Sequence, residues 1–125
     1  MMNILIAFDA EADTGYISLT EKQTAPVTTE DIGDSPLMAD LDRDNRIIGI
    51  EFTGKAAPDV AQLGSLTGRK RKLEVASLAD RSIYRFRANG LKAVNMLQMN
   101  GIRFYFADDE FRHFIGFDIE REKSE

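Results

Sequence analysis

Four acidic residues have the spacing of a calcium-binding loop. Asp40, Asp42, Asp44 and Glu51 occupy positions 1, 3, 5 and 12 of the loop that binds Ca²⁺ between two helices. Position 6 of that loop is a glycine, but here it is Asn45, and a strand pattern follows. A polar hairpin turn, with Asn45 at a positive φ, explains the same residues without a metal. The turn is therefore the favoured interpretation, and calcium is the alternative.

A second cluster of carboxylates lies near the N-terminus, in the turn Asp9–Asp13. Paired carboxylates can perform acid–base chemistry when one of them is buried and its pKa is raised. A turn between two strands is usually solvated, so a structural role is favoured. The acidic residues that we predict to contact a protein partner are Asp9, Glu11, Asp13, Asp40, Asp42 and Asp44.

The segment 69–103 is basic, with nine Lys or Arg residues and two acids. Strand alternation places Arg85 and Arg87 on one face and Tyr84 and Phe86 on the other. A basic sheet face could bind phosphates, whereas the alternative is a solvated face whose arginines meet the acidic first half. The candidate nucleic-acid-binding residues are Arg69, Lys70, Arg71, Lys72, Arg85 and Arg87.

Other catalytic chemistry has little support in the sequence. His113 is the single histidine and there is no cysteine, which argues against a hydrolase triad and a zinc site. Alternation with Ile115 and Phe117 predicts that His113 lies on the apolar face of the last strand. The glycines form no phosphate-binding loop. We predict no catalytic residue and no cofactor.

Two predicted hairpins carry the acidic turns. Apolar residues at 4, 6 and 8 precede the first turn, and a strand with Tyr16, Ile17 and Leu19 follows it. The second hairpin runs from Leu37–Leu41 through the turn 42–46 to a strand at 47–52.

These hairpins resemble a small prokaryotic family known as a domain of unknown function, number 2283. Its members share an F/Y-D-x-E-A-D-x-x-Y-I-x-L opening and a D-x-D-x-x-x-x-x-G-I-E close, which residues 8–19 and 42–51 approximate. The resemblance covers about residues 3–53 and implies a fold, not an activity. It further implies an association with toxin-like proteins.

The second half of the chain predicts a hairpin, a helix and another hairpin. Strands are expected around Leu73–Ser77 and Ile83–Phe86, and a helix at Leu91–Met99, where apolar residues recur every three positions. Asn100-Gly101 is a helix stop signal, and a hairpin of Ile102–Ala107 with Arg112–Glu120 follows. Residues 83–119 are faintly similar to the sheet of RelE/HigB-type toxins, from which no catalytic residue is carried over.

The predicted fold class is therefore α+β, with antiparallel hairpins and one helix. Residues 1–53 form an acidic double-hairpin unit, 54–70 a linker with a short helix, and 71–120 a second unit packed on the first. A shift of 67 residues aligns Ile48-Gly49 with Ile115-Gly116, which suggests a tandem duplication.

Charge divides unevenly between the halves, with a net of −8 over residues 1–66 and +3 over 67–125. No apolar run is long enough to span a membrane, and the lack of cysteine is compatible with the cytoplasm. The sequence predicts a protein-interaction module, antitoxin-like or inhibitory, that binds a protein partner and forms a homodimer through its sheet edges. A nucleic-acid-binding module using residues 69–103 is the alternative.

Overall fold

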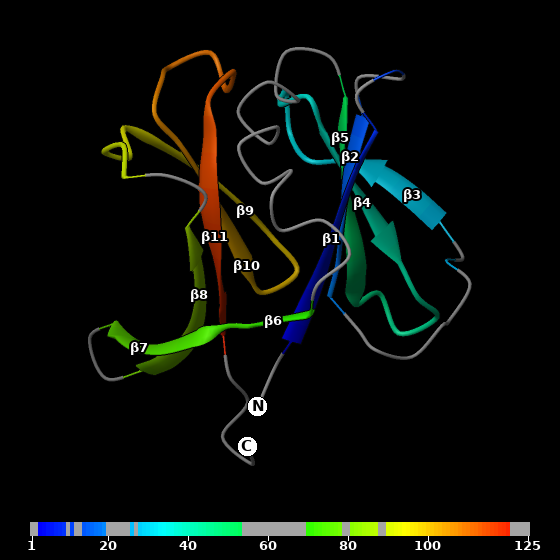
Figure 1. Cartoon of the computed structure of the whole chain (residues 1–125), viewed down its shortest axis with the longest axis horizontal. Coiled ribbons are helices and arrows are strands. Elements are labelled where there is room, and N and C mark those ends of the chain that lie inside the picture. Colours follow the sequence, from blue (N-terminus) through cyan, green and yellow to red (C-terminus); the bar gives the residue numbers. More distant parts are fainter. Residues whose placement is uncertain are drawn as a thin grey trace.

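The computed structural model of the chain describes residues 3–9, 11, 14–19, 26, 28–53, 70–78, 81–87 and 90–120. These residues form eleven strands in two antiparallel sheets, and none of them is helical (Figure 1). The fold is therefore all-β, and the predicted α+β class is wrong. Among the described residues, no helix is long and apolar enough to cross a membrane.

The first sheet has six strands in the order β3-β4-β5-β2-β1-β6. Their bounds are β1 (Asn3–Asp9), β2 (Thr14–Ser18), β3 (Thr28–Asp31), β4 (Leu37–Leu41), β5 (Ile47–Thr53) and β6 (Lys70–Lys72). The two hairpins predicted in the first half are confirmed as β1–β2 and β4–β5. The predicted linker helix falls on residues outside the described part of the chain.

The second sheet has five strands in the order β7-β8-β11-β10-β9. Their bounds are β7 (Glu74–Leu78), β8 (Arg81–Arg87), β9 (Asn95–Met99), β10 (Ile102–Phe106) and β11 (Phe114–Glu120). The two predicted hairpins of this half are confirmed as β7–β8 and β10–β11.

The helix predicted at Leu91–Met99 is absent, because Asn95–Met99 forms strand β9. The spacing of Leu91, Val94 and Leu97 suits a helix, but Leu97 and Met99 also alternate as a strand does. Asn100 and Gly101, with φ values of 47° and 83°, form the two-residue turn that joins β9 to β10. Pairing with β10 thus overrides the local helical pattern.

The second unit, β7–β11, repeats the strand order of the first unit, β1–β5. The orders are β3-β4-β5-β2-β1 and β9-β10-β11-β8-β7, and a 67-residue shift places β5 on β11. Each unit also has a register shift at the same place, between Asp40 and Leu41 and between Tyr105 and Phe106. This agreement in topology supports the internal repeat suggested by the sequence.

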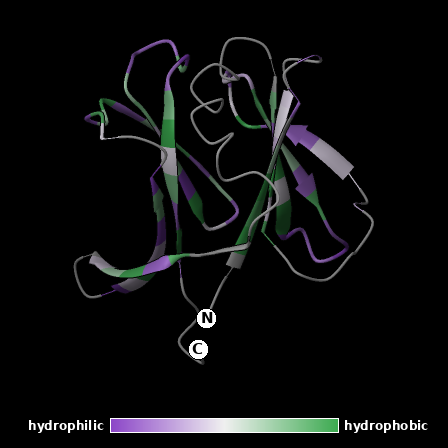
Figure 2. Ribbon diagram, viewed as in Figure 1, coloured by the Kyte–Doolittle hydropathy of each residue, from purple (hydrophilic) through white to green (hydrophobic). Residues whose placement is uncertain are grey.

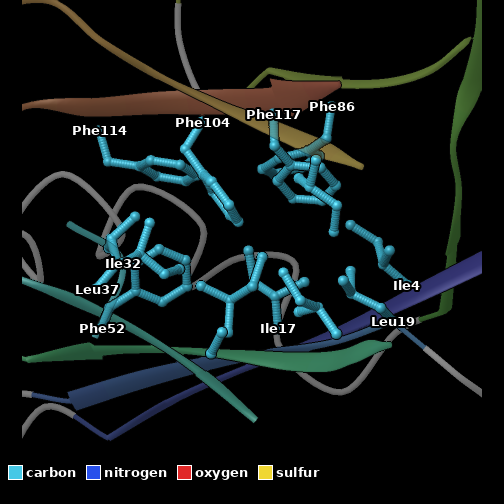
Figure 3. Packing of buried hydrophobic residues seen from close by; sticks show 14 of the residues in the cluster. Ile4, Ile17, Leu19, Ile32, Leu37, Phe52, Phe86, Phe104, Phe114 and Phe117 are labelled. Atoms are coloured by element: carbon cyan, nitrogen blue, oxygen red, sulfur yellow. The ribbon is translucent and has the colours of Figure 1, made fainter. Parts of the chain in front are cut away.

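The core lies between the two sheets and includes residues of both (Figure 3). Phe52 of β5 packs against Phe114 of β11, with ring centroids 5.1 Å apart. Ile17 and Phe117 are completely buried in the same cluster. Figure 2 shows hydrophobic stretches on strands of both sheets. Burial of these aromatic and branched side chains provides the main stabilisation of the fold.

The chain passes between the sheets at β6 and β7 (Figure 1). β6 pairs with β1 in the first sheet and β7 with β8 in the second, and Leu73 between them is buried in the core. At the opposite edges, the first sheet ends at β3 and the second sheet ends at β9. Gly33, in the turn that follows β3, lies against Leu97 of β9, so this turn contacts the edge of the second sheet.

Candidate functional site

The outer face of the first sheet holds a buried carboxylate, Asp40 on β4, which is only 6% exposed. Its Oδ1 accepts a hydrogen bond of 2.7 Å from the Thr29 hydroxyl on β3. Its Oδ2 accepts one of 2.9 Å from the Tyr16 hydroxyl on β2. Because β5 lies between β2 and β4, the ring of Tyr16 crosses β5 at Gly49, where any side chain would overlap its hydroxyl.

Burial and the bond to Asp40 raise the pKa of Tyr16. The tyrosine proton is therefore held firmly on the phenol, which acts as a donor to Asp40 and not as a general base. This arrangement binds three strands together, and its chemistry is structural.

Asp42 and Asp44 lie apart from this carboxylate, in the β4–β5 turn. Oδ1 of Asp42 accepts hydrogen bonds from the backbone N–H groups of Asp44, at 2.8 Å, and Arg46, at 3.0 Å. Asn45 has a φ of 59°, as the turn interpretation predicts. In the part of the chain that the structure describes, no three acidic or histidine residues form a group that could hold a metal ion.

Glu51 of β5 shares the outer face with Asp40. Burial and the nearby charge of Asp40 raise the pKa of Glu51. The folded state therefore disfavours the charged form of Glu51. At pH values above its pKa in the folded state, this carboxylate lowers the stability of the fold. At pH values below its pKa in the unfolded state, it has no such effect.

Replacing Glu51 with glutamine is accordingly expected to raise the free energy of unfolding at pH 7, by up to about 0.5 kcal/mol. The gain should vanish near pH 4, where Glu51 becomes protonated in both states. Urea unfolding at several pH values measures it, with the exposed Glu30→Gln as the control. An equal gain at pH 4 and pH 7 would show that charge is not the cause.

The remaining acidic residues of the predicted partner surface are near the first turn. Oδ1 of Asp9 accepts a hydrogen bond of 3.0 Å from the backbone N–H of Glu11, which is a turn-forming contact. Asp13 lies outside the described residues. The structure thus places Asp40 on β4, Asp42 and Asp44 in the β4–β5 turn, and Asp9 and Glu11 at the first turn, and does not gather them into one site.

Two arginines of the predicted nucleic-acid surface are already paired. Arg85 and Arg87 lie on the outer face of β8, as the alternation predicted, while Phe86 is buried. Both bind Oδ1 of Asp118 on β11, at 3.2 Å and 2.9 Å respectively. Arg69 is outside the described residues, and Lys70, Arg71 and Lys72 form β6.

Asp118 is the centre of this outer face and was missed by the sequence analysis. It is 2% exposed and also accepts a hydrogen bond of 3.0 Å from the Tyr105 hydroxyl on β10. The guanidinium of Arg87 lies 4.7 Å from the centre of the Tyr105 ring. Because Asp118 lies between Phe117 and Ile119 in the sequence, strand alternation indicates that it faces outward. Only the strand order, which pairs β11 with β8, brings Arg85 and Arg87 to it.

Charges on this face compensate one another. Asp118 lies opposite Arg85 on one side and Arg103 on the other. Glu120 binds Arg81 at 2.6 Å. Burial alone would raise the pKa of Asp118, but hydrogen bonds from Arg85 and Arg87 outweigh it and lower that pKa. The face is therefore less attractive to phosphates than the count of arginines suggested.

A different candidate site is the outer edge of β9. In the described residues β9 pairs with β10 alone. The strand Asn95–Met99 has no charged residue, and three exposed apolar side chains lie on or just before it, Leu91 (54%), Val94 (56%) and Met96 (43%). We call residues 91–99 the β9 edge segment. Its counterpart β3 is Thr-Thr-Glu-Asp, with all four residues exposed, and its acidic composition discourages pairing.

The turn at Asn100-Gly101 fixes which backbone groups face outward from β9. Met99 and Ile102 flank a two-residue turn and therefore form a hydrogen-bonded pair. Alternation then directs the N–H and C=O groups of Met96 and Gln98 away from β10. The N–H of Met96 binds Oδ1 of Asn95 at 3.0 Å. The Gln98 N–H and the outward carbonyls are the groups available to another strand.

Comparison with known proteins identifies a family match over the first unit. Residues 5–54 match a family model described as a protein of unknown function (DUF2283). This confirms the resemblance predicted for about residues 3–53, and the match covers the strands of the first unit. No curated protein and no solved structure matches the chain. The likeness of residues 83–119 to RelE/HigB-type toxins is not shown by these comparisons.

Proposed function

We propose that this protein is a non-catalytic interaction module, of the antitoxin-like or inhibitory kind, that binds a protein partner through the β9 edge. The observation that carries the proposal is the uncharged edge strand with exposed apolar residues beside it. Native proteins usually protect such edges with charge, proline or a covering segment. An extended segment of a partner can add to the sheet here, with backbone hydrogen bonds providing affinity.

Nucleic-acid binding is the weaker alternative. A surface that releases counterions from nucleic acid needs lysines and arginines that are free to meet phosphates. Arg81, Arg85 and Arg87 are instead engaged by Glu120 and Asp118. A cytoplasmic location belongs to the same proposal, since an inhibitor of an intracellular protein would act there.

A charged residue on the edge should abolish binding. We expect Met96→Lys to reduce capture of the partner by the tagged full-length protein by about tenfold or more, because a lysine on an edge strand opposes strand addition. Capture from nuclease-treated host lysate, quantified by mass spectrometry, measures this effect. Thr28→Lys, on the equivalent edge β3, is the matched control and should capture the partner normally.

Two results would contradict the proposal. Equal capture by Met96→Lys and the wild type would place the binding surface elsewhere. Loss of all captured protein after nuclease treatment would favour the nucleic-acid alternative.

A further inference from the structure

We infer that the segment bound by the β9 edge is a basic one, an extended stretch of another protein in which lysine or arginine alternates with apolar residues. This inference rests on the proposed function and adds the chemistry of the partner. It follows from what surrounds β9 on the two faces of the second sheet.

The outer face of β9 carries an exposed apolar side chain, Met96. Met96 and Gln98 lie on this face, with Met96 opposite Tyr105 of β10, and Val94 lies just before the strand. Val94 and Met96 are both substantially exposed. A strand added beside β9 would place every second side chain next to these residues, so apolar side chains on that face would remove exposed apolar surface from water.

The inner face of the same edge adjoins carboxylates of the first unit. Leu97 points inward and touches Gly33, in the turn that follows β3. Glu30 and Asp34, before and after Gly33, are exposed, and Glu30 pairs with the buried Ala39, which places it on the inner face of β3. Neither carboxylate forms a salt bridge within the described residues.

The N-terminal end of β9 meets a further acidic loop. The side-chain N–H of Asn95 donates a hydrogen bond of 3.4 Å to the backbone carbonyl of Asp109. Asp109 is exposed, whereas its neighbour Glu110 pairs with Arg112 at 2.8 Å. Lys92 is the single charged residue of the β9 edge segment itself.

Electrostatic complementarity therefore favours a basic occupant over a second copy of this chain. Two copies joined at β9 would bring two sets of the same carboxylates together, in a protein whose net charge is already −5. Basic side chains on the inward row of an added strand would instead lie on the same side as Glu30 and Asp34. Such pairing contributes to the association rate and selects against acidic segments.

Two labelled nine-residue peptides test the inference on the full-length protein, one alternating lysine with valine and one alternating glutamate with valine. Fluorescence anisotropy should show at least tenfold tighter binding of the lysine peptide, weakening as salt is raised. Gln98→Pro removes the outward N–H of β9 and should abolish that binding. Glu30→Gln combined with Asp34→Asn should reduce the preference for lysine while the β9 edge stays intact.

A backbone control guards against misfolding of the proline variant. The lysine peptide with alternate N-methylated residues keeps its charge but cannot pair fully with a strand, so it should bind the wild-type protein at least tenfold more weakly. Hydrogen exchange of the wild-type protein should show that the unmodified peptide protects the Gln98 amide.

Three outcomes would overturn the inference. Binding of the lysine peptide that survives both Gln98→Pro and N-methylation would be attraction of charge without strand addition. A dimer in analytical ultracentrifugation that Gln98→Pro dissociates would make a second copy the occupant. If neither peptide binds while Met96→Lys still abolishes capture of the partner, the proposed function stands and the basic chemistry is wrong.

Discussion

Replacing Gly116 with alanine is expected to lower the free energy of unfolding by about 3 kcal/mol or more. A Cβ atom at this position would overlap the carbonyl oxygen of Phe86 and lie 3.0 Å from the Cα of Arg87. Both are backbone atoms of β8, which is paired on both sides, with β7 and β11. The φ of 153° at Gly116 is also one that residues with a side chain rarely adopt. Neither the strand nor the residue can relax cheaply.

Two other glycines make the comparison informative. Gly49 has the position of Gly116 in the first unit, but the atoms nearest to a Cβ there are the hydroxyl and ring of Tyr16, a side chain that can rotate away at the cost of its hydrogen bond to Asp40. Gly90 has no atom within 4 Å of such a Cβ. We expect the loss of stability in urea to decrease from Gly116→Ala to Gly49→Ala, and Gly90→Ala to change it by less than about 0.5 kcal/mol. Equal stabilities for the Gly116 and Gly90 variants would refute the steric argument.

Much of the strand pattern could be predicted from the sequence because hairpins are local. Alternation of Ile4 with Ile6, and of Tyr84 with Phe86, identifies strands and their buried faces, and all four side chains lie in the core. The prediction at Leu91–Met99 failed because a short apolar segment can satisfy both the helical and the strand period. Asn-Gly ends helices and also forms tight hairpin turns, so the signal after Met99 could not decide between them.

The same limit applies to His113. Simple alternation with Ile115 and Phe117 placed it on the apolar face, yet His113 is exposed and precedes β11. The register shift opposite Tyr105 and Phe106 inserts Ile115 as an extra residue, which reverses the alternation before it. A bulge of this kind depends on the partner strand, and the local sequence does not reveal it.

Some features of the candidate site follow from local sequence, and others depend on contacts between residues far apart in the chain. The sequence shows that residues 95–99 lack charge and that Arg85 and Arg87 share a face. It does not show that β9 lies at the edge of a sheet, or that β11 lies between β8 and β10. Strand order decides both whether an apolar strand is accessible and whether an arginine is neutralised. For this reason the strongest basic signal in the sequence is not the best candidate site in the fold.

The ion pairs at Asp118 lead to the second large expected effect. Asp118→Asn should lower the free energy of unfolding at pH 7 by about 2–3 kcal/mol, because it leaves Arg85 and Arg87 side by side without their counter-charge. We expect less than for a fully buried pair, since each arginine side chain is about one-third exposed, at 32% and 33%. Tyr105 also loses a charged acceptor, although the asparagine oxygen can still accept its hydroxyl hydrogen bond.

The pH dependence of this loss identifies its cause. Arg85 and Arg87 lower the pKa of Asp118 in the folded state, whereas an unfolded aspartate titrates near about 3.9. The stabilisation by Asp118 is therefore complete well above that value and disappears as the pH falls through the folded pKa. In acid the wild-type carboxyl becomes neutral, like the asparagine that replaces it. The difference between the two proteins should thus shrink as the pH falls from 5 towards 2.

Urea unfolding of the wild type and Asp118→Asn across this pH range measures the difference directly. Glu120→Gln is the matched control, because it removes a carboxylate from the same strand whose close partner Arg81 is mostly exposed, with 68% of its side chain accessible, and whose second partner Arg103 is 3.9 Å away. Exposed ion pairs contribute little to stability, so this variant should remain close to the wild type at every pH. A difference for Asp118→Asn that stays constant down to pH 2 would mean that packing, and not the buried charge, holds the outer faces of β8, β11 and β10 together.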